Sequence, residues 1–157
     1  MKVFITGGTG FLGAALTEGL LGEGHSVTIL SRSSQKGPLR MGLAYCAGNP
    51  TKSGPWQEEV SRHDVVINLA GASIFRPWND KNKKAIRNSR ILTTRNLVDA
   101  IGQAPENITL LSGSAVGYYG FRDDEALDEN SPPGHDFLAD VVEACETEAK
   151  RAEQFVV

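Results

Sequence analysis

Three glycines near the N-terminus have the spacing of a phosphate-binding turn. Gly7, Gly10 and Gly13 directly follow the apolar run 3–5, and a segment with helical apolar spacing begins at Phe11. The first glycine permits a tight turn, the second lets a pyrophosphate approach the backbone, and the third lets the helix pack closely on the sheet. The amides at the helix N-terminus would then face the phosphates. No Gly-Lys-Ser/Thr follows, which excludes an NTPase P-loop. The pattern predicts a dinucleotide site, with an ordinary glycine-rich turn as the alternative.

The end of the next apolar segment distinguishes NAD from NADP. An NAD site usually has Asp or Glu about 20 residues after the glycines, where the carboxylate binds the ribose 2′-hydroxyl. Here the chain reads Leu30, Ser31, Arg32, Ser33, without an acid. A guanidinium can instead form charge-assisted hydrogen bonds to a 2′-phosphate, each worth roughly 1.5–3 kcal/mol. Arg32 therefore favours NADP, unless it is simply an exposed loop arginine.

Strands and helices alternate along the chain in the way that positions such a site at one edge of a parallel sheet. We expect strands at 2–6, 26–30, 43–46, 64–70 and 107–112. We expect helices at 11–23, 55–62, 80–103 and 137–153, and the beginning of a sixth strand at 155–157. Several strands are apolar on both faces, which favours a three-layer α/β fold with a doubly wound parallel sheet of the Rossmann type. Residues 1–157 are therefore predicted to form a single NADP-binding domain.

Composition and charge argue against several classes of partner. The 157 residues are 40% hydrophobic and 22% charged, which is typical of one soluble globular domain. A net charge of -3 argues against nucleic acid, and no segment has the length of a membrane span. Cys46 and Cys145 are far apart and fit free thiols in a reducing cytosol. We therefore expect a cytoplasmic protein without a metal site.

Other motifs accompany the glycine turn. TGGTGFLG is followed by NLAG at 68–71 and SGSAVGYYG at 112–120, and together these resemble the extended short-chain dehydrogenase/reductases, the superfamily of nucleotide-sugar epimerases and reductases. RPWNDKNKKAIRNSRILTTRNLVDAI at 76–101 and ENSPPGHDFLADVV at 129–142 are similar to one atypical branch, the epimerase-like family of 39U type. The resemblance covers essentially the whole chain. It implies an N-terminal half, truncated before the substrate-binding part, because members of the family are about twice as long.

The resemblance implies a set of cofactor-binding residues, position by position. Those expected at the pyrophosphate are Gly7, Thr9, Gly10, Phe11 and Leu12. Ser31 and Arg32 would hold the adenosine ribose or its phosphate. Those expected along the ribose and adenine side, and then next to the nicotinamide, are Leu69, Ala70, Gly71, Ser112 and Gly113. All lie at or just after the carboxyl ends of strands, in agreement with the rule that ligands bind outside the carboxyl ends of a parallel sheet.

Catalysis in the superfamily uses a Ser, a Tyr and a Lys. The Tyr exchanges a proton with the substrate while a hydride moves to or from the nicotinamide, and the Lys lowers the pKa of the Tyr. The resemblance matches Ser114 to the serine; a strand-end serine bonded to the backbone is the alternative. The YxxxK pair is expected on the last helix, but Phe137 and Val141 occupy those positions and no YxxxK occurs anywhere. The usual proton relay is therefore missing.

Other side chains are candidates to replace the missing pair. Tyr118 follows Ser114 closely, but a phenol titrates near 10 and would need a nearby cation, for which Arg90 and Arg122 are the candidates. Asp136, Glu143 and His135 are weaker candidates, because exposed helix and loop positions are commoner for such residues.

Three hypotheses for the function follow. The first is an NADP-dependent oxidoreductase or epimerase-like enzyme acting on a sugar nucleotide or a small carbonyl compound. The second is a non-catalytic module that binds or senses NADP(H), and the missing YxxxK favours it. The third is an inactive truncated fragment. An exposed edge at the fifth or sixth strand would need a cover, for which a homodimer is the expected solution.

Overall fold

Five parallel strands form one sheet in the order β3-β2-β1-β4-β5. The computed structural model describes residues 1–33 and 40–155. The strands are β1 (Lys2–Thr6), β2 (Ser26–Ser31), β3 (Leu43–Ala47), β4 (Val65–Asn68) and β5 (Thr109–Ser112). The last residue of β1, Thr6, pairs with Leu30 on one side and Asn68 on the other. The carboxyl ends of neighbouring strands therefore lie together along one edge.

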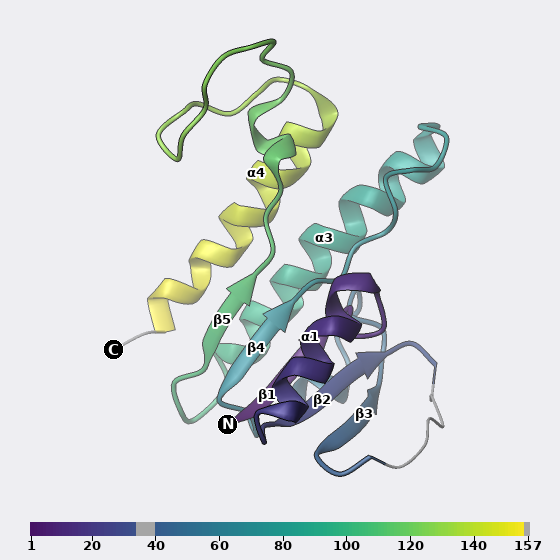
Figure 1. Ribbon diagram of the computed structural model, residues 1–157, viewed down its shortest axis with the longest axis vertical. Helices are drawn as coiled ribbons and strands as arrows, with labels where there is room; N and C mark the ends of the chain where they lie inside the picture. The colour runs from purple at the N-terminus through teal and green to yellow at the C-terminus, as the bar shows by residue number, and fades with distance from the viewer. Residues whose placement is uncertain (34–39, 156–157) are drawn as a thin grey trace.

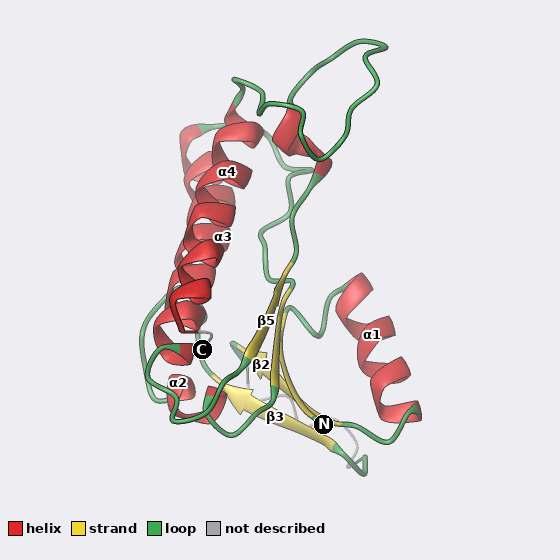
Figure 2. Cartoon of the chain, turned by 90° about the vertical axis from the view of Figure 1, so that its left-hand side faces the viewer, coloured by secondary structure: helices red, strands yellow, loops and turns green. Residues whose placement is uncertain are grey.

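Helices cover both faces of this sheet. On one face lies α1 (Phe11–Gly22), and on the other lie α2 (Trp56–Val60), α3 (Asp80–Ile101) and α4 (Phe137–Lys150) (Figures 1 and 2). Two short 3-10 helices, η1 (Val116–Tyr119) and η2 (Arg151–Phe155), flank α4. The chain runs from β1 outward to β3 and then returns to the other side of β1 as β4. This confirms the doubly wound α/β fold and places the topological switch point between β1 and β4.

Alternation along the strands divides the core into two apolar layers. Val3 and Ile5 of β1 face α1, whereas Phe4 faces α2 and α3. The layer beneath α1 contains Val3, Ile5, Val27, Ile29 and Ile67. The opposite layer contains Phe4, Leu30, Trp56, Val60, Val66, Leu97, Ala100, Ile101 and Ile108. Burial on both faces explains why β1 reads as a continuous apolar run.

The five observed strands match the expected ranges to within two residues at each end, and two differences from the expectation have a clear tertiary cause. β4 ends at Asn68 instead of residue 70, because Leu69 and Ala70 turn away to pass against Gly7. The expected sixth strand is wrong at Phe155, which ends η2 and packs its ring over Gly102 at the end of α3. The rest of that expected strand, residues 156 and 157, lies outside the described residues.

An ion-pair network holds α4 against α3. Glu148 of α4 accepts hydrogen bonds from Arg95 of α3 and from Arg151, whose Nη1 lies 2.7 Å from Oε2 of Glu148. Arg151 also reaches Asp99 of α3 at 2.8 Å. The hydrogen bonds from Arg95 and then Arg151 hold the pKa of Glu148 below its usual value, against the opposing effect of burial. The network therefore fixes the helix that forms one wall of the cavity described below.

Replacing Glu148 with glutamine is expected to lower the free energy of unfolding by about 1 kcal/mol at pH 7. Because the pKa of Glu148 is lower in the folded chain, its contribution is present above the unfolded value of 4.5 and is lost as the pH falls further. Urea denaturation of wild type and Glu148→Gln at pH 7 and pH 3 measures this. Glu143→Gln, an exposed change on the same helix, should have no effect at either pH. A loss for Glu148→Gln that is the same at both pH values would contradict the network.

Candidate dinucleotide site

The glycine turn between β1 and α1 has no room for a side chain at Gly7 or Gly13. Gly7 has a φ of +77°, and a Cβ atom there would lie 2.7 Å from the carbonyl carbon and oxygen of Leu69. A Cβ atom on Gly13 would overlap the Gly7 carbonyl oxygen and the Gly8 Cα. The amide of Gly10 closes the turn by donating to the Gly7 oxygen at 2.9 Å. Gly7 thus packs on the β4 segment, and Gly13 packs α1 onto the turn.

The N-terminus of α1 is suited to an anion. Gly10 is the N-cap residue, no side chain caps the helix among the described residues, and the first turn contains no acid. A Cβ atom on Gly10 would meet only the Gly7 oxygen, at 3.2 Å, so the space outside this glycine is open. Helix amides without a cap, together with the positive end of the helix dipole, bind phosphates. The turn therefore fits the pyrophosphate of a dinucleotide.

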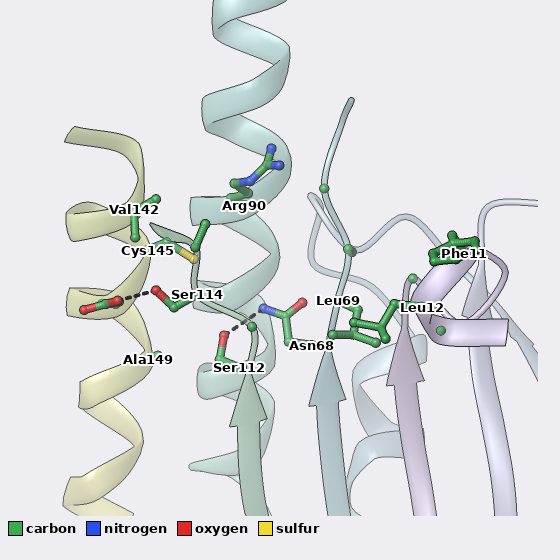
Figure 3. A pocket seen from close by; sticks show the side chains of 18 of the residues that line it. Phe11, Leu12, Asn68, Leu69, Arg90, Ser112, Ser114, Val142, Cys145 and Ala149 are labelled. Atoms are coloured by element: carbon green, nitrogen blue, oxygen red, sulfur yellow. Dashed lines mark hydrogen bonds between the residues drawn. The ribbon is translucent and has the colours of Figure 1, made fainter. Parts of the chain in front are cut away.

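A cavity of about 490 Å³ extends from this turn across the ends of β4 and β5 to α4 (Figure 3). Its walls come from the glycine turn, the segments after β4 and β5, and one face each of α3 and α4. The predicted residues that line it are Gly7, Gly10, Phe11, Leu12, Leu69, Ala70, Gly71, Ser112, Gly113 and Ser114. The structure thus brings ten of the fourteen predicted site residues into one cavity.

The other four predicted residues lie outside the cavity lining. Thr9 is exposed at the tip of the glycine turn. Ser31 ends β2 and Arg32 follows it, exposed, one strand away from the end of β1. That position is where an adenosine ribose would extend from a pyrophosphate at the glycine turn. Tyr118 lies in η1, half-buried, with its ring 5.2 Å from that of Tyr119.

Asn68 connects the elements beneath the cavity floor. This buried side chain accepts a hydrogen bond from Thr6 of β1 at 2.7 Å. It donates to Thr94 of α3 at 2.9 Å and to Ser112 of β5 at 3.3 Å. Both polar atoms of the side-chain amide are therefore hydrogen-bonded, and these bonds link β1, β4, β5 and α3 at the strand ends. The sequence identified Asn68 only as part of the NLAG motif. The signal that could have revealed its role is a polar residue at the end of an apolar strand.

Ser114 is paired with a carboxylate that sequence analysis missed. Its hydroxyl donates to Oε1 of Glu146 on α4 at 2.5 Å, within the range of charge-assisted O–H···O bonds (Figure 3). Both side chains line the cavity, and Glu146 is the one carboxylate in the described lining. The backbone-bonded alternative for Ser114 is therefore wrong. The sequence signal that could have identified Glu146 is its position on α4, one turn after Val142.

The cavity-facing positions of α4 differ by one residue from those expected for the YxxxK pair. Val142 lines the cavity, whereas Val141 is 1% exposed and absent from the lining. Phe137 instead packs its ring at 5.6 Å from Trp78, with the Lys83 ammonium 5.5 Å from the ring centroid. The residue one turn before Val142 is Leu138, so these two positions lack a tyrosine and a lysine; the lysine of α4 that lines the cavity is Lys150, two turns after Val142. Packing of Phe137 on Trp78 explains the shift.

The remaining acid–base candidates have structural roles or lie in solvent. Asp136 is the N-cap of α4 and accepts from the amides of Leu138 and Ala139. His135 and Glu143 are exposed. Arg122 bonds the carbonyl oxygens of Tyr119 and Pro132, which folds the segment after β5. None of these side chains lines the cavity.

Three further titratable side chains line the cavity: Arg90, Cys145 and Lys150. Burial lowers the pKa of Arg90 and raises the pKa of the Cys145 thiol. The Cys145 sulfur lies 3.1 Å from the Thr94 hydroxyl, beneath the surface of α4. Within residues 1–33 and 40–155, no three His, Cys, Asp or Glu side chains gather closely enough to hold a metal ion. None of the helices in the described segments is long and apolar enough to cross a membrane.

A sequence profile of the NAD dependent epimerase/dehydratase family matches residues 3–138, most of the chain. The chain belongs to this family. The match agrees with the glycine turn, the strand order and the cavity at the strand ends. The family is named for its dependence on NAD, and the site described here has the features of a nicotinamide dinucleotide site.

Relatives in the epimerase family confirm the resemblance to the 39U branch. The chloroplastic SDR39U1 homolog of Arabidopsis thaliana is 36% identical over 160 residues, which cover 99% of this chain and 46% of that protein. The structure of human SDR39U1 (isoform2) with NADPH has a TM-score of 0.75 and 33% identity, over 95% of this chain and 48% of the human one. A nucleoside-diphosphate sugar epimerase from Corynebacterium glutamicum has a TM-score of 0.80 and 35% identity, over 98% and 31% respectively. The chain spans about half the length of the curated relatives it matches.

Proposed function

We propose that this chain binds NADP(H) in the cavity and forms the cofactor-binding part of an NADP-dependent epimerase or oxidoreductase. The observation that carries the proposal is the glycine turn, where a Cβ on Gly7 or Gly13 would strike backbone beside an α1 N-terminus that no side chain caps. Arg32 in place of an acid supports NADP over NAD. NADPH in the human relative's structure supports the same choice.

Each group of cavity residues has a distinct role in this proposal. The amides at the start of α1 would hold the pyrophosphate, and Arg32 would hold the 2′-phosphate. Ser112 and Gly113 would lie beside the nicotinamide, which accepts or donates a hydride when bound. Glu146 holds the one proton of Ser114 in a hydrogen bond and fixes the orientation of its hydroxyl, so Ser114 Oγ would accept a hydrogen bond from a substrate hydroxyl. The substrate class proposed is a sugar nucleotide, from the Corynebacterium relative, or a small carbonyl compound.

One observation favours a second candidate function. The cavity face of α4 has Val142 where a charged residue would be needed to assist a tyrosine, and Leu138 one turn earlier. Glu146 and Lys150 also line this face, but the tyrosine of the superfamily's proton relay is absent, and a cavity without it can still bind a dinucleotide. The second candidate is therefore a module that binds or senses NADP(H) without turnover.

Parallel titrations with NADPH and NADH, followed by nicotinamide fluorescence, test the proposed function. We expect wild type to bind NADPH at least tenfold more tightly than NADH, because hydrogen bonds to charged groups contribute roughly 1.5–3 kcal/mol. Arg32→Gln should remove this preference by weakening NADPH binding and leaving NADH binding unchanged. Equal binding of both by wild type would exclude the role of Arg32, and binding of neither would overturn the proposed function.

Arg62→Gln is the matched control for this experiment. Arg62 is also exposed, and the substitution removes the same charge, but Arg62 lies just before β4, at the opposite edge of the sheet from the cavity. An equal loss of NADPH affinity in both variants would show a general charge effect instead of a specific contact with Arg32.

A further inference from the structure

Two surfaces of opposite charge lie at one end of the molecule, the end towards which β4 and β5 point. The basic surface consists of Arg76 and three exposed cations along the first half of α3, which are Lys81, Lys84 and Arg87. The acidic loop is the segment 123–129 after η1, and its sequence is DDEALDE. Figures 1 and 2 place the two surfaces on opposite sides of this end.

The cations of the basic surface have no counterion within the described fold. Lys81, Lys84 and Arg87 follow one another at intervals of three residues, so they occupy neighbouring positions on α3. Like charges at this spacing repel each other and weaken a helix. The ion pairs among the described residues include none of these three cations and not Arg76. An anionic partner would therefore relieve this repulsion.

The acidic loop carries an excess of negative charge. Five of its seven residues are acidic, and all seven are exposed. In the part of the chain that the structure describes, its one ion pair joins Glu125 to Arg122 at 3.6 Å. Hydrogen bonds from the Asn130 amide and then the Ser131 hydroxyl hold the pKa of Asp128 below its usual value, so this carboxylate is ionised at neutral pH.

Local hydrogen bonds hold both surfaces in place. The Tyr119 hydroxyl donates to the carbonyl oxygen of Asp128 at 2.9 Å, which ties η1 to the acidic loop. On the other side, the Trp78 indole donates to the carbonyl oxygen of Ile74 at 2.9 Å and closes the turn that contains Phe75. Surfaces that are already formed lose less conformational freedom when they bind a partner.

Each surface also has an exposed aromatic side chain beside it. Phe75, which precedes Arg76, is 93% exposed, and Phe121, two residues before the acidic loop, is 90% exposed. Burying an aromatic ring removes a large apolar area from water, and aromatic residues are enriched in protein–protein interfaces. The combination of unpaired charge and an exposed ring favours a protein partner for each surface over a purely solvated face.

We propose that the basic surface of one copy of this chain binds the acidic loop of a second copy. The two surfaces lie on opposite sides of one end, so a twofold rotation that brings two copies end to end places each basic surface opposite the other copy's acidic loop. Both contacts then form at once, and the pair is closed. The inference is independent of the proposed function, because none of these residues lines the cavity.

Sedimentation velocity of wild type over a range of protein concentrations tests the proposal. The salt concentrations are about 0.1 M and about 1 M, at which exposed charges are screened over about 10 Å and about 3 Å. We expect a monomer–dimer equilibrium that is at least about tenfold weaker at the higher salt. A chain that stays monomeric would overturn the proposal, even if the basic surface then binds another anion such as an oligonucleotide. Dimers that are insensitive to salt would overturn it as well, in favour of an uncharged face such as the open edge of β5.

Two triple variants, each with one surface reversed in charge, identify the surfaces that meet. The first places glutamate on the basic surface, as Lys81→Glu, Lys84→Glu and Arg87→Glu. The second places lysine on the acidic loop, as Asp124→Lys, Glu125→Lys and Glu129→Lys. We expect each variant alone to be monomeric, because like charges then face each other. Their equimolar mixture should associate about as well as wild type, because every contact again joins opposite charges. A mixture that stays monomeric would overturn the proposal.

A matched pair of double variants separates a specific contact from an effect of net charge. Lys84→Glu with Arg87→Glu should weaken association at least about tenfold. Lys2→Glu with Arg62→Glu makes the same change in net charge at exposed positions at the opposite end of the strands, and should associate like wild type. An equal loss in both would overturn the proposal, and the salt dependence of wild type decides if a variant does not fold.

Discussion

Replacing Gly7 with alanine is expected to lower the free energy of unfolding by about 3 kcal/mol and to abolish dinucleotide binding. Gly7 has a φ of +77°, which costs a residue with a side chain roughly 1–2 kcal/mol. The new Cβ would also lie 2.7 Å from the Leu69 carbonyl, and overpacking of this kind adds about 1–3 kcal/mol. Urea denaturation measures the first effect and an NADPH titration the second.

Gly24→Ala separates the two contributions. Gly24 has nearly the same φ, +79°, but a Cβ atom there would have no neighbour within 4 Å. Its substitution should cost only about 1 kcal/mol, because the backbone strain is present without the collision. Both changes reduce the freedom of the unfolded chain alike, so the difference between them isolates the close approach of the turn to β4. Equal losses would show that Gly7 and Leu69 are not in contact.

The sequence predicts the architecture because its strongest signals are local. Strands β1 and β4 are buried on both faces and therefore contain uninterrupted apolar runs, whereas the run in β2 is interrupted by Thr28. The predicted strand ends were less accurate where tertiary contacts determine the residue at which a strand stops. Leu69 and Ala70 are as apolar as a strand requires, but their backbone turns to contact Gly7, which no local pattern reveals.

The candidate site also has one part that was predictable from the sequence and another part that was not. The glycine turn was predictable because its glycines are close in sequence and their conformational need is local. The contribution of α3 and α4 was not, because which side of a helix faces a cavity depends on how the helix packs. Glu146 is exposed or engaged according to the placement of α4 on Ser114, and Arg90 according to the loop at Gly71. For the same reason the sequence did not show that Val142 lines the cavity whereas Phe137 and Val141 do not.

Placing a lysine on α4 is expected to lower the stability by very different amounts at two adjacent positions. Val141→Lys should lower the free energy of unfolding by about 4 kcal/mol at pH 7, because Val141 is 1% exposed and its surroundings cannot solvate a charge. Val142→Lys should cost no more than about 1 kcal/mol. Val142 is 7% exposed, but it lines the cavity, into which an ammonium can extend towards Glu146 one turn later. Urea denaturation at pH 7 and pH 9.5 compares the two variants.

The pH dependence shows whether burial causes the loss. Burial lowers the pKa of an ammonium, so the unfolded Val141→Lys chain binds more protons than the folded one, and its stability should rise with pH. Val142→Lys should show little change, and Asp140→Lys, at an exposed position, should match wild type. A larger loss for Val142→Lys than for Val141→Lys would show that the cavity-facing side of α4 is the one expected from the sequence.

The expected order of losses also bears on the missing catalytic pair. If the cavity wall accepts a lysine at position 142, then the fold does not prevent the superfamily's charge from being there. Valine at that position then reflects the chemistry of this cavity and not a packing constraint. Ser114 keeps Glu146 as its hydrogen-bond acceptor. If neither position tolerates a lysine, the packing of α4 on α3 excludes the superfamily's proton relay altogether, and binding without turnover becomes the better account of the site.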